Sequence, residues 1–452
     1  MKNLKRKEAP DGSEAAKIHP FFSVSKKARS GVPEVSDNAA APMSEEATTV
    51  DNLQELIDFT SINNEAEILT RFDAIAKALL HDYLIVVTRA DGTTTRLQIL
   101  EHEFYLQKAG CHEDPFTHGS EEQKIAGKWY FHRAPLFSAD SNRSLTSTTS
   151  YRTGSRKGLD LTIGRPESQA HPGDGAKEPP RLRGGVLLRS IRVLSSTGAG
   201  KTKVVSGPSL LVDEILSLSG SPEIPDLVQN KWNADTSAFP NANSSTTSTS
   251  TVTAESPSIS LRLVHKAALG LTATTTTSAT KIYSSPRIGL ELSHPGTGSA
   301  KVRPPHSRIR FLPRKYRYFT CPKELTANGR YQTCLGLLLH FCAKYHAGGS
   351  TSKSSATNAS ASSSSAGVAA DKPDLDQILK DNLVRLTADI GGTMGMKEAT
   401  TKNYLEYFKE GRAGGAGMLD AKFIGAKGKG AGGSPSMYLA MMGAVSTVVT
   451  ML

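Results

Sequence analysis

The chain has little cysteine and no apolar leader segment. Only four of its 452 residues are cysteine, and they form neither a CxxC pair nor a regular framework. Such sparse cysteines fit a reducing compartment rather than a disulfide-bonded secreted domain. The basic residues at the N-terminus are not followed by an apolar stretch, so we expect neither a secretory signal nor an N-terminal anchor.

An apolar run long enough for a membrane helix is also missing at the other end. Residues 437–452 carry no charge, but these 16 residues fall short of the roughly 20 that a helix needs to cross a bilayer. We therefore expect a short helix that packs on the domain, and no membrane partner.

Apolar side chains are scarce in several internal segments. Ser/Thr-rich or Gly-rich tracts occupy about 140–156, 243–256, 271–279, 347–369 and 413–434. These tracts bury too little apolar surface to offset the entropy cost of ordering them. The chain is therefore expected to form one interrupted domain rather than the two or three that its length suggests.

The same composition sets the expected boundaries. We predict a disordered tail at 1–50, a folded domain at 64–345, a low-complexity linker at 346–370 and a partly helical C-terminal extension at 371–452. Disordered insertions in the domain are expected at about 140–156, 165–180 and 233–280.

Positive charge is what the chain has in excess. Lys and Arg number 54 against 43 Asp and Glu, which gives a formal net charge of +11, spread over the tails and the folded part. This excess favours a polyanionic partner such as nucleic acid. A basic protein without such a partner could have the same charge, so charge alone does not establish that the chain binds nucleic acid.

The N-terminal tail contains two short motifs. The basic clusters Lys5-Arg6-Lys7 and Lys26-Lys27-Ala28-Arg29 are separated by a polar spacer, which is the pattern of a bipartite nuclear import signal. Between them, Ile18, Phe21 and Phe22 have the spacing of a sliding-clamp-binding box. The Gln that opens such a box is replaced by Ala15. We expect nuclear localisation and interpret the second motif as a clamp-binding candidate.

The folded part mixes helical and strand patterns. Apolar residues recur at three- and four-residue spacing over 64–80, which predicts a helix, and a helix is also expected at 209–216 after Gly207-Pro208. Strands are expected at 84–88, 94–101, 128–132, 158–163, 185–193, 287–292 and 308–311. This mixture predicts an α+β fold.

Several short segments occur in the same order as in one enzyme family. They are ILEHEFYL at 99–106, DPFTH at 114–118, GKWYFH at 127–132, GVLLR at 185–189, SGPS at 206–209, PRIG at 286–289 and RIRF at 308–311. Each is weak alone, but the ordered series resembles the alkyladenine (3-methyladenine) DNA glycosylases. The insertions and the residues beyond 325 have no counterpart in that pattern.

The resemblance implies a fold and an activity. The fold would be a mixed, largely antiparallel curved sheet with peripheral helices. The activity would be hydrolysis of the N-glycosidic bond of a damaged purine, alkylated or deaminated, in double-stranded DNA, by a monomer that needs no cofactor or metal. Glu103 would be the general base that activates water, with the target base flipped out of the duplex.

The neighbouring residues suit that chemistry. Glu101 and Tyr105 share a strand face with Glu103, and we expect the two carboxylates to raise each other's pKa. His118, Tyr130 and His132 would complete stacking walls around a flipped purine. The family has an Asn at the floor of the pocket where this chain has Asp160, and an ionised Asp only accepts hydrogen bonds, so the preferred base is expected to differ.

A basic loop follows the pocket strands. Tyr151 precedes Arg152, Arg156 and Lys157 in a glycine-containing turn, which suits a DNA-facing wedge: the aromatic ring would fill the vacated stack while the cations hold phosphates. A solvated basic turn would have the same composition. Arg189, in the LLR segment, is a further candidate for DNA contact.

Two alternatives stay open. The residues Glu101, Glu103, His112, Asp114 and His118 have the ligand types of a zinc, iron or manganese site, which would suit a metal-dependent hydrolase, although their spacing matches no compact site. The domain could also be a DNA-binding protein of the same fold that has lost catalysis.

Overall fold

The computed structural model describes residues 52–137, 144–169, 180–194, 202–240, 259–271, 280–326, 328–350 and 374–451. The import clusters, the motif of Ile18, Phe21 and Phe22, and most of the linker predicted at 346–370 lie outside these residues. So do 138–143, 170–179, 241–258 and 272–279, which fall in the predicted insertions.

Two helices open the described chain. The short α1 (Leu53–Leu56) is capped by Asn52, and α2 (Glu65–Lys77) begins where the side chain of Asn64 accepts a hydrogen bond from the backbone of Glu67. The predicted helix over 64–80 is confirmed, because its apolar stripe is buried against the sheet while one wider turn, Ala78–Asp82, leads into the first strand.

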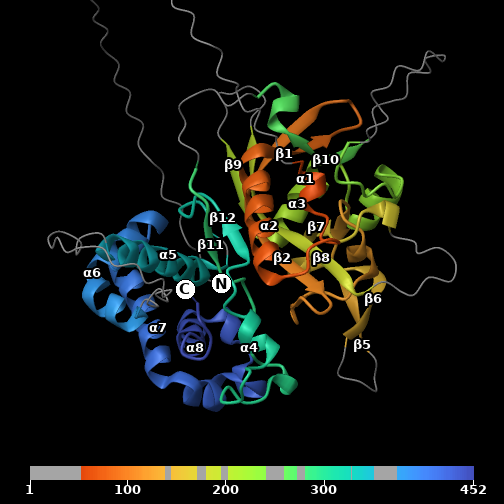
Figure 1. Ribbon diagram of the computed structural model, residues 1–452. Coiled ribbons are helices and arrows are strands. Elements are labelled where there is room, and N and C mark those ends of the chain that lie inside the picture. Colours follow the sequence, from red (N-terminus) through yellow and green to blue (C-terminus); the bar gives the residue numbers. More distant parts are fainter. Residues whose placement is uncertain are drawn as a thin grey trace, which may run out of the picture. The chain divides into compact units, whose positions relative to one another are not determined.

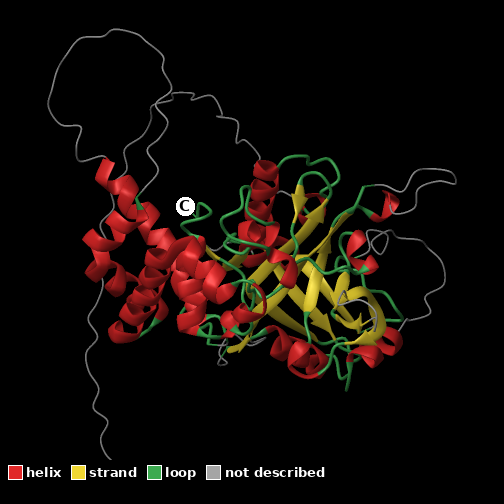
Figure 2. Cartoon of the chain, turned by 90° about the horizontal axis from the view of Figure 1, so that it is seen from below, coloured by secondary structure: helices red, strands yellow, loops and turns green. Residues whose placement is uncertain are grey.

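The main sheet is antiparallel and curled (Figures 1 and 2). Its strand order is β10 (Ser260–His265), β1 (Tyr83–Thr88), β2 (Thr94–Lys108), β8 (Leu182–Leu194), β7 (Leu159–Ile163) and β4 (Trp129–Phe131). Short strands branch from it: β3 (His112–Glu113) and β12 (Arg317–Phe319) pair with β2, β11 (Tyr283–Ser285) pairs with β12, and β9 (Lys203–Ser206) pairs with β8. With its surrounding helices this is the α+β fold that the sequence predicts.

Strand β2 is the centre of this sheet. It pairs with β8 from Arg96 to Lys108, while its other edge pairs first with β1 and then, at residues 101–103, with β12. The register against β8 shifts on either side of Glu101, which marks β-bulges. Bulges re-aim side chains and often lie next to functional sites.

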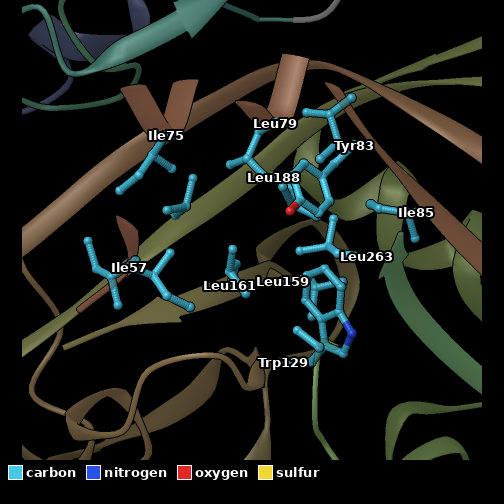
Figure 3. Close-up of a cluster of buried hydrophobic side chains, with 14 of the residues drawn as sticks. Ile57, Ile75, Leu79, Tyr83, Ile85, Trp129, Leu159, Leu161, Leu188 and Leu263 are labelled. Atoms are coloured by element: carbon cyan, nitrogen blue, oxygen red, sulfur yellow. The ribbon is translucent and has the colours of Figure 1, made fainter. Parts of the chain in front are cut away.

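One hydrophobic core lies between α2, α3 (Pro208–Leu218) and the sheet. Figure 3 shows side chains of this core from the end of α1, from α2 and the turn after it, and from the sheet, among them Ile57, Ile75, Leu79, Tyr83, Trp129, Leu161, Leu188 and Leu263. Each large apolar side chain buried in this way contributes about 1.5–3 kcal/mol relative to exposure. Alternate side chains of β2, such as Phe104, pack in this core, so the side chains between them lie on the opposite face of the sheet.

The C-terminal helices form a second core. They are α5 (Arg330–Ser350), α6 (Leu375–Met394), α7 (Glu398–Met418) and α8 (Pro435–Val445). The helix expected within 437–452 is confirmed, and it packs on this core. None of the helices in the described ranges is long and apolar enough to cross a membrane.

The Gly-rich tract at 413–434 is ordered, so the prediction that it could not be is wrong. It completes α7 and then forms short helical turns. Neighbouring glycines allow the helices to touch by their backbones: a Cβ at Gly411 would lie 1.9 Å from the carbonyl oxygen of Ala440, and one at Gly443 would lie 2.0 Å from that of Phe408. Close packing of α7 on α8 replaces the missing side-chain contacts.

Other local predictions are also wrong. Residues 287–292 form turns rather than a strand, and residues 308–311 belong to a helix, α4 (Ser307–Phe311), which begins at a His306 cap after two prolines. Parts of the predicted insertions are ordered as well: β6 (Ser144–Tyr151) pairs with β5 (Arg133–Phe137), and β10 extends the main sheet.

One buried histidine is expected to make the stability of the fold depend on pH. His102, on the α2 side of β2, is fully buried, and neither ring nitrogen has a hydrogen-bond partner among the described residues. Burial lowers the pKa of His102 to about 3, from 6.5. Between these values the unfolded chain binds a proton that the folded chain does not, so stability rises with pH.

We expect the free energy of unfolding to fall as the pH drops from 6.5, by up to about 1.4 kcal/mol per pH unit from this group. Denaturant titrations at pH 7 and pH 5 should show a smaller loss for His102→Phe than for the parent. Burial also lowers the pKa of His112, so some loss should persist in the variant. Equal losses in both proteins would rule out His102 as the source.

Candidate functional site

Strand β2 divides its side chains between two environments. Phe104 stacks on Phe72 of α2, with ring centroids 4.2 Å apart. Because successive side chains in a strand point to opposite faces, Glu103 and Tyr105 lie on the face away from α2. On that face the loop after β11 contributes the backbone N–H of Ile288, and the neighbouring strands β8 and β12 contribute the side chains of Arg189 and Arg317.

Glu103 is fully buried and held at both oxygens. Its Oε1 accepts a hydrogen bond from the backbone N–H of Ile288 at 2.8 Å. Its Oε2 accepts from the Tyr105 hydroxyl at 2.9 Å and from Nη1 of Arg189 at 3.4 Å. A carboxylate has about four acceptor positions, so these three bonds orient it and leave one for a water molecule.

Glu101 has a different role from the one expected. It is buried and accepts from Nε of Arg317 at 2.6 Å, Nε of Arg189 at 3.2 Å and the hydroxyl of Ser190. Burial alone would raise the pKa of Glu101, but Arg317, Arg189 and Ser190 together outweigh burial and the pKa is lowered. The expectation that the two carboxylates raise each other's pKa is therefore wrong for Glu101, which stays ionised as the counter-charge of two arginines.

Arg189 joins the two carboxylates. Its side chain is 7% exposed, and it donates to both Glu101 and Glu103. A guanidinium engaged in this way has little surface for a DNA phosphate, so its placement fits the orientation of Glu103 better than the predicted DNA contact.

Two aromatic rings face each other beside Glu103. The rings of Tyr105 and His118 are nearly parallel, at 25°, with centroids 6.5 Å apart. Burial and the Glu103 carboxylate raise the pKa of Tyr105, which therefore remains a hydroxyl donor to Glu103. The guanidinium of Arg287 also lies over the Tyr105 ring, 4.5 Å from its centroid.

The predicted floor residues form a hydrogen-bonded group. Nε2 of His132 lies 2.8 Å from Oδ1 of Asp160, and Nε2 of Gln123 donates to Oδ2 of Asp160 at 3.1 Å. The His132 ring contacts His118 edge-on at 4.8 Å and lies 5.8 Å from Tyr130, which is buried. Sequence reasoning missed Gln123, whose only signal is its position before β4.

Two glycines make room for this group. A Cβ at Gly158 would lie 2.7 Å from the ring of His132, and a Cβ at Gly185 would lie 2.7 Å from Oδ2 of Asp160. Both distances are shorter than any ordinary contact. The glycines in the GLDLTI and GGVLLR segments therefore allow the histidine and the aspartate to approach the backbone.

The predicted wedge loop is not arranged as a wedge. Tyr151 is partly buried, packs edge-on against Phe131 at 6.2 Å and carries the Arg133 guanidinium 3.8 Å above its ring. Arg152 donates to the carbonyl of Arg133, and Lys157 pairs with Asp213 of α3. Arg156 is exposed. The ring that was expected to enter the duplex is thus packed against the core.

A buried ion pair lies next to Tyr105, and the sequence did not predict that its two residues meet. The guanidinium of Arg287 and the carboxylate of Asp114 are both fully buried and make a two-bond contact, while Nη1 of Arg287 also donates to the carbonyl of Phe104 at 3.0 Å. Both residues fall in the segments that resemble the glycosylases, but nothing in their spacing predicts that they meet.

The side chains considered as metal ligands are engaged in other contacts. Glu101 and Asp114 are paired with arginines, and His112 lies within hydrogen-bond distance of the carbonyl of Leu106 and the hydroxyl of Tyr316. Among the residues that the structure describes, no three His, Cys, Asp or Glu side chains come together as a metal site would require.

The geometry thus brings together Glu103, Tyr105, His118, His132 and Asp160, with Tyr130 beside them. The loop after Tyr151 adjoins this group at His132, whose backbone bonds to Arg152 and Gly158, but the Tyr151 ring packs against Phe131 instead. Comparisons with known proteins add no family. No protein-family model matches the chain, and none of the curated proteins matches it significantly.

Proposed function

We propose that this protein is a DNA glycosylase that hydrolyses the N-glycosidic bond of a damaged purine. The observation that carries the proposal is the buried Glu103 carboxylate, oriented by three hydrogen bonds and placed directly beside the facing rings of Tyr105 and His118. The ordered resemblance to the alkyladenine glycosylases supports the same chemistry.

The spacing of the Tyr105 and His118 rings is close to that needed to stack a planar base between them. A base stacked between two aromatic planes needs about 7 Å between them, or two contacts of about 3.5 Å. The centroids of Tyr105 and His118 are 6.5 Å apart, so a small rotation of His118, which is exposed, would admit a purine. Bases flipped out of a duplex are commonly held by such stacking.

Glu103 would then act on water. A water molecule hydrogen-bonded to the carboxylate attacks the sugar C1′ and gives a proton to Glu103 as the glycosidic bond breaks. The bonding electrons leave with the purine nitrogen, and the leaving purine is protonated from solvent or from the site. Ile288 N–H, Tyr105 and Arg189 keep the carboxylate in place during this step.

Nuclear residence and binding to a sliding clamp belong to the same proposal. Their support is the sequence of the tail: the two basic clusters, and the spacing of Ile18, Phe21 and Phe22. A clamp would bring a repair enzyme to newly replicated DNA.

Asp160 gives a prediction about the floor of the site. In Asp160→Asn an NH2 group replaces one carboxylate oxygen, so the side chain no longer offers His132 and Gln123 a separate acceptor oxygen each, as Asp160 does. We expect a stability loss of about 1–3 kcal/mol and a changed ratio of excision rates for hypoxanthine and 3-methyladenine. Denaturant titration and single-turnover assays would measure these. An unchanged ratio would remove Asp160 from base selection.

The proposal is tested by offering the full chain a panel of duplexes, each with one alkylated or deaminated purine. Binding and release of the free base are measured on the same duplexes. Release from at least one of them supports the glycosylase. Tight binding without release from any of them would indicate a non-catalytic DNA-binding protein.

A further inference from the structure

The most basic stretch of the described chain lies outside the predicted wedge loop. Residues 292–323 contain eight Lys or Arg and no Asp or Glu. Within this stretch Lys301, Arg303 and Arg310 are exposed. Arg314 and Arg317 pair with Glu65 and Glu101, which leaves the exposed cations around the turn. Exposed cations gathered in one stretch are what binding to a phosphate backbone requires.

An apolar side chain stands at the tip of the same stretch. Val302 is 59% exposed, although most valines are buried, and it lies between Lys301 and Arg303. Pro304 and Pro305 follow. Proteins that distort a duplex from the minor groove insert an apolar wedge between base pairs and flank it with cations.

The tip is fixed at its base. The carboxylate of Asp420, in the C-terminal extension, accepts from the hydroxyl of Ser299 and from the backbone N–H of Ala300, both at 2.7 Å. Nη1 of Arg303 donates back to the carbonyls of Ala300 and Val302. A turn held in this way presents its side chains without a large entropy cost on binding.

The turn leads into the candidate site. It precedes α4, whose Arg308 lies 4.9 Å from the centroid of the Phe116 ring. The guanidinium of Arg287 lies over that ring as well, at 5.4 Å, and over Tyr105 at 4.5 Å. Arg308 is therefore separated from the Tyr105 ring by one aromatic and one guanidinium group.

We infer that the turn Lys301–Arg303 is the DNA wedge of this protein: Val302 enters the space left by the flipped base, while Lys301 and Arg303 contact phosphates on either side. The inference rests on the proposed function and replaces Tyr151 in the wedge role, because the Tyr151 ring is packed against Phe131 and covered by Arg133. Asp420 acts as the positioning residue of the turn.

The test uses the full chain and a duplex with a stable abasic analogue next to 2-aminopurine. Binding is measured over a range of salt for the parent, Val302→Ala and the double variant Lys301→Ala/Arg303→Ala. Matched controls are Val384→Ala, a valine 80% exposed on α6, and Lys380→Ala/Lys402→Ala, two exposed lysines on α6 and α7. Thermal unfolding of each variant checks its fold.

We expect the double variant to lower the log–log salt slope by about 2, because each phosphate that a cation no longer neutralises accounts for about 0.9 of the slope. Val302→Ala should bind about tenfold more weakly with an unchanged slope and a smaller rise in 2-aminopurine fluorescence, because the substitution shortens the apolar wedge but removes no charge. The controls should match the parent.

Binding and slopes equal to those of the controls would overturn the inference, as would a parent that does not bind the duplex. The proposed function is judged separately by base release. Release without an effect of the turn variants leaves the glycosylase standing and removes the wedge. If the turn variants weaken binding but no lesion is released, the turn is a DNA contact and the glycosylase proposal fails.

Discussion

Glu103→Gln should excise damaged bases at least about 100-fold more slowly than the parent and bind lesion DNA about equally well. The amide is nearly isosteric and can still accept a hydrogen bond, but it cannot take a proton from water. The stacking rings and the cations that hold a flipped nucleotide are not changed. Single-turnover excision with binding measured in parallel separates the two effects.

A matched control is Glu223→Gln, an exposed carboxylate whose removal should leave excision unchanged. Glu101→Gln should slow excision less than Glu103→Gln, because Glu101 faces Arg189 and Arg317 rather than the reacting atoms. Excision by Glu103→Gln at the rate of the parent would contradict the assignment of the general base.

Arg287→Met should destabilise the fold by about 3–5 kcal/mol, because it leaves the Asp114 carboxylate buried without its counter-charge. It also removes the donor to the carbonyl of Phe104. For a chain of this size such a loss lowers Tm by roughly 5 °C. Differential scanning calorimetry against Arg181→Met, which removes an exposed arginine, measures the effect.

The double variant Arg287→Met/Asp114→Asn should recover part of the lost stability, since it removes the unpaired charge as well. If the double variant is less stable than Arg287→Met alone, the unpaired Asp114 charge is not the cause of the loss.

Local patterns were enough for much of the fold. The period of apolar residues predicted α2, and the apolar runs at 84–88 and 94–101 predicted the strands β1 and β2. The resemblance predicted a strand that carries Glu103, and the apolar run at 158–163 predicted the strand that carries Asp160; His132 lies directly after β4 rather than on it. These signals are local because each belongs to one helix, one turn or one strand.

The contacts that were missed join residues far apart in the chain. Arg317 reaches Glu101 from 216 positions away, and Arg287 reaches Asp114 from 173. Neither pairing has a local sequence signal. Residues 308–311 alternate like a strand, but the His306 cap and the burial of Ile309 and Phe311 in the cores favour a helix there.

The C-terminal extension shows the limit of composition as evidence. The glycines of 413–434 suggested a tract without order, yet a Cβ at Gly428 in this tract would lie 1.8 Å from the carbonyl oxygen of Phe423, and the flanking Gly411 and Gly443 are required where α7 and α8 touch. A glycine that permits close packing and a glycine in a flexible tract look alike in a sequence. Only the partner helix distinguishes them.

The central claim is that the chain releases a damaged purine as the free base, and the most direct measurement is the identity of the product. Chromatography of a duplex with one 3-methyladenine or hypoxanthine, after single-turnover reaction with the parent and with Glu103→Gln, would resolve it. The account predicts free base and an abasic strand from the parent, and almost none from Glu103→Gln. No free base from any lesion with the parent, despite binding, would contradict it.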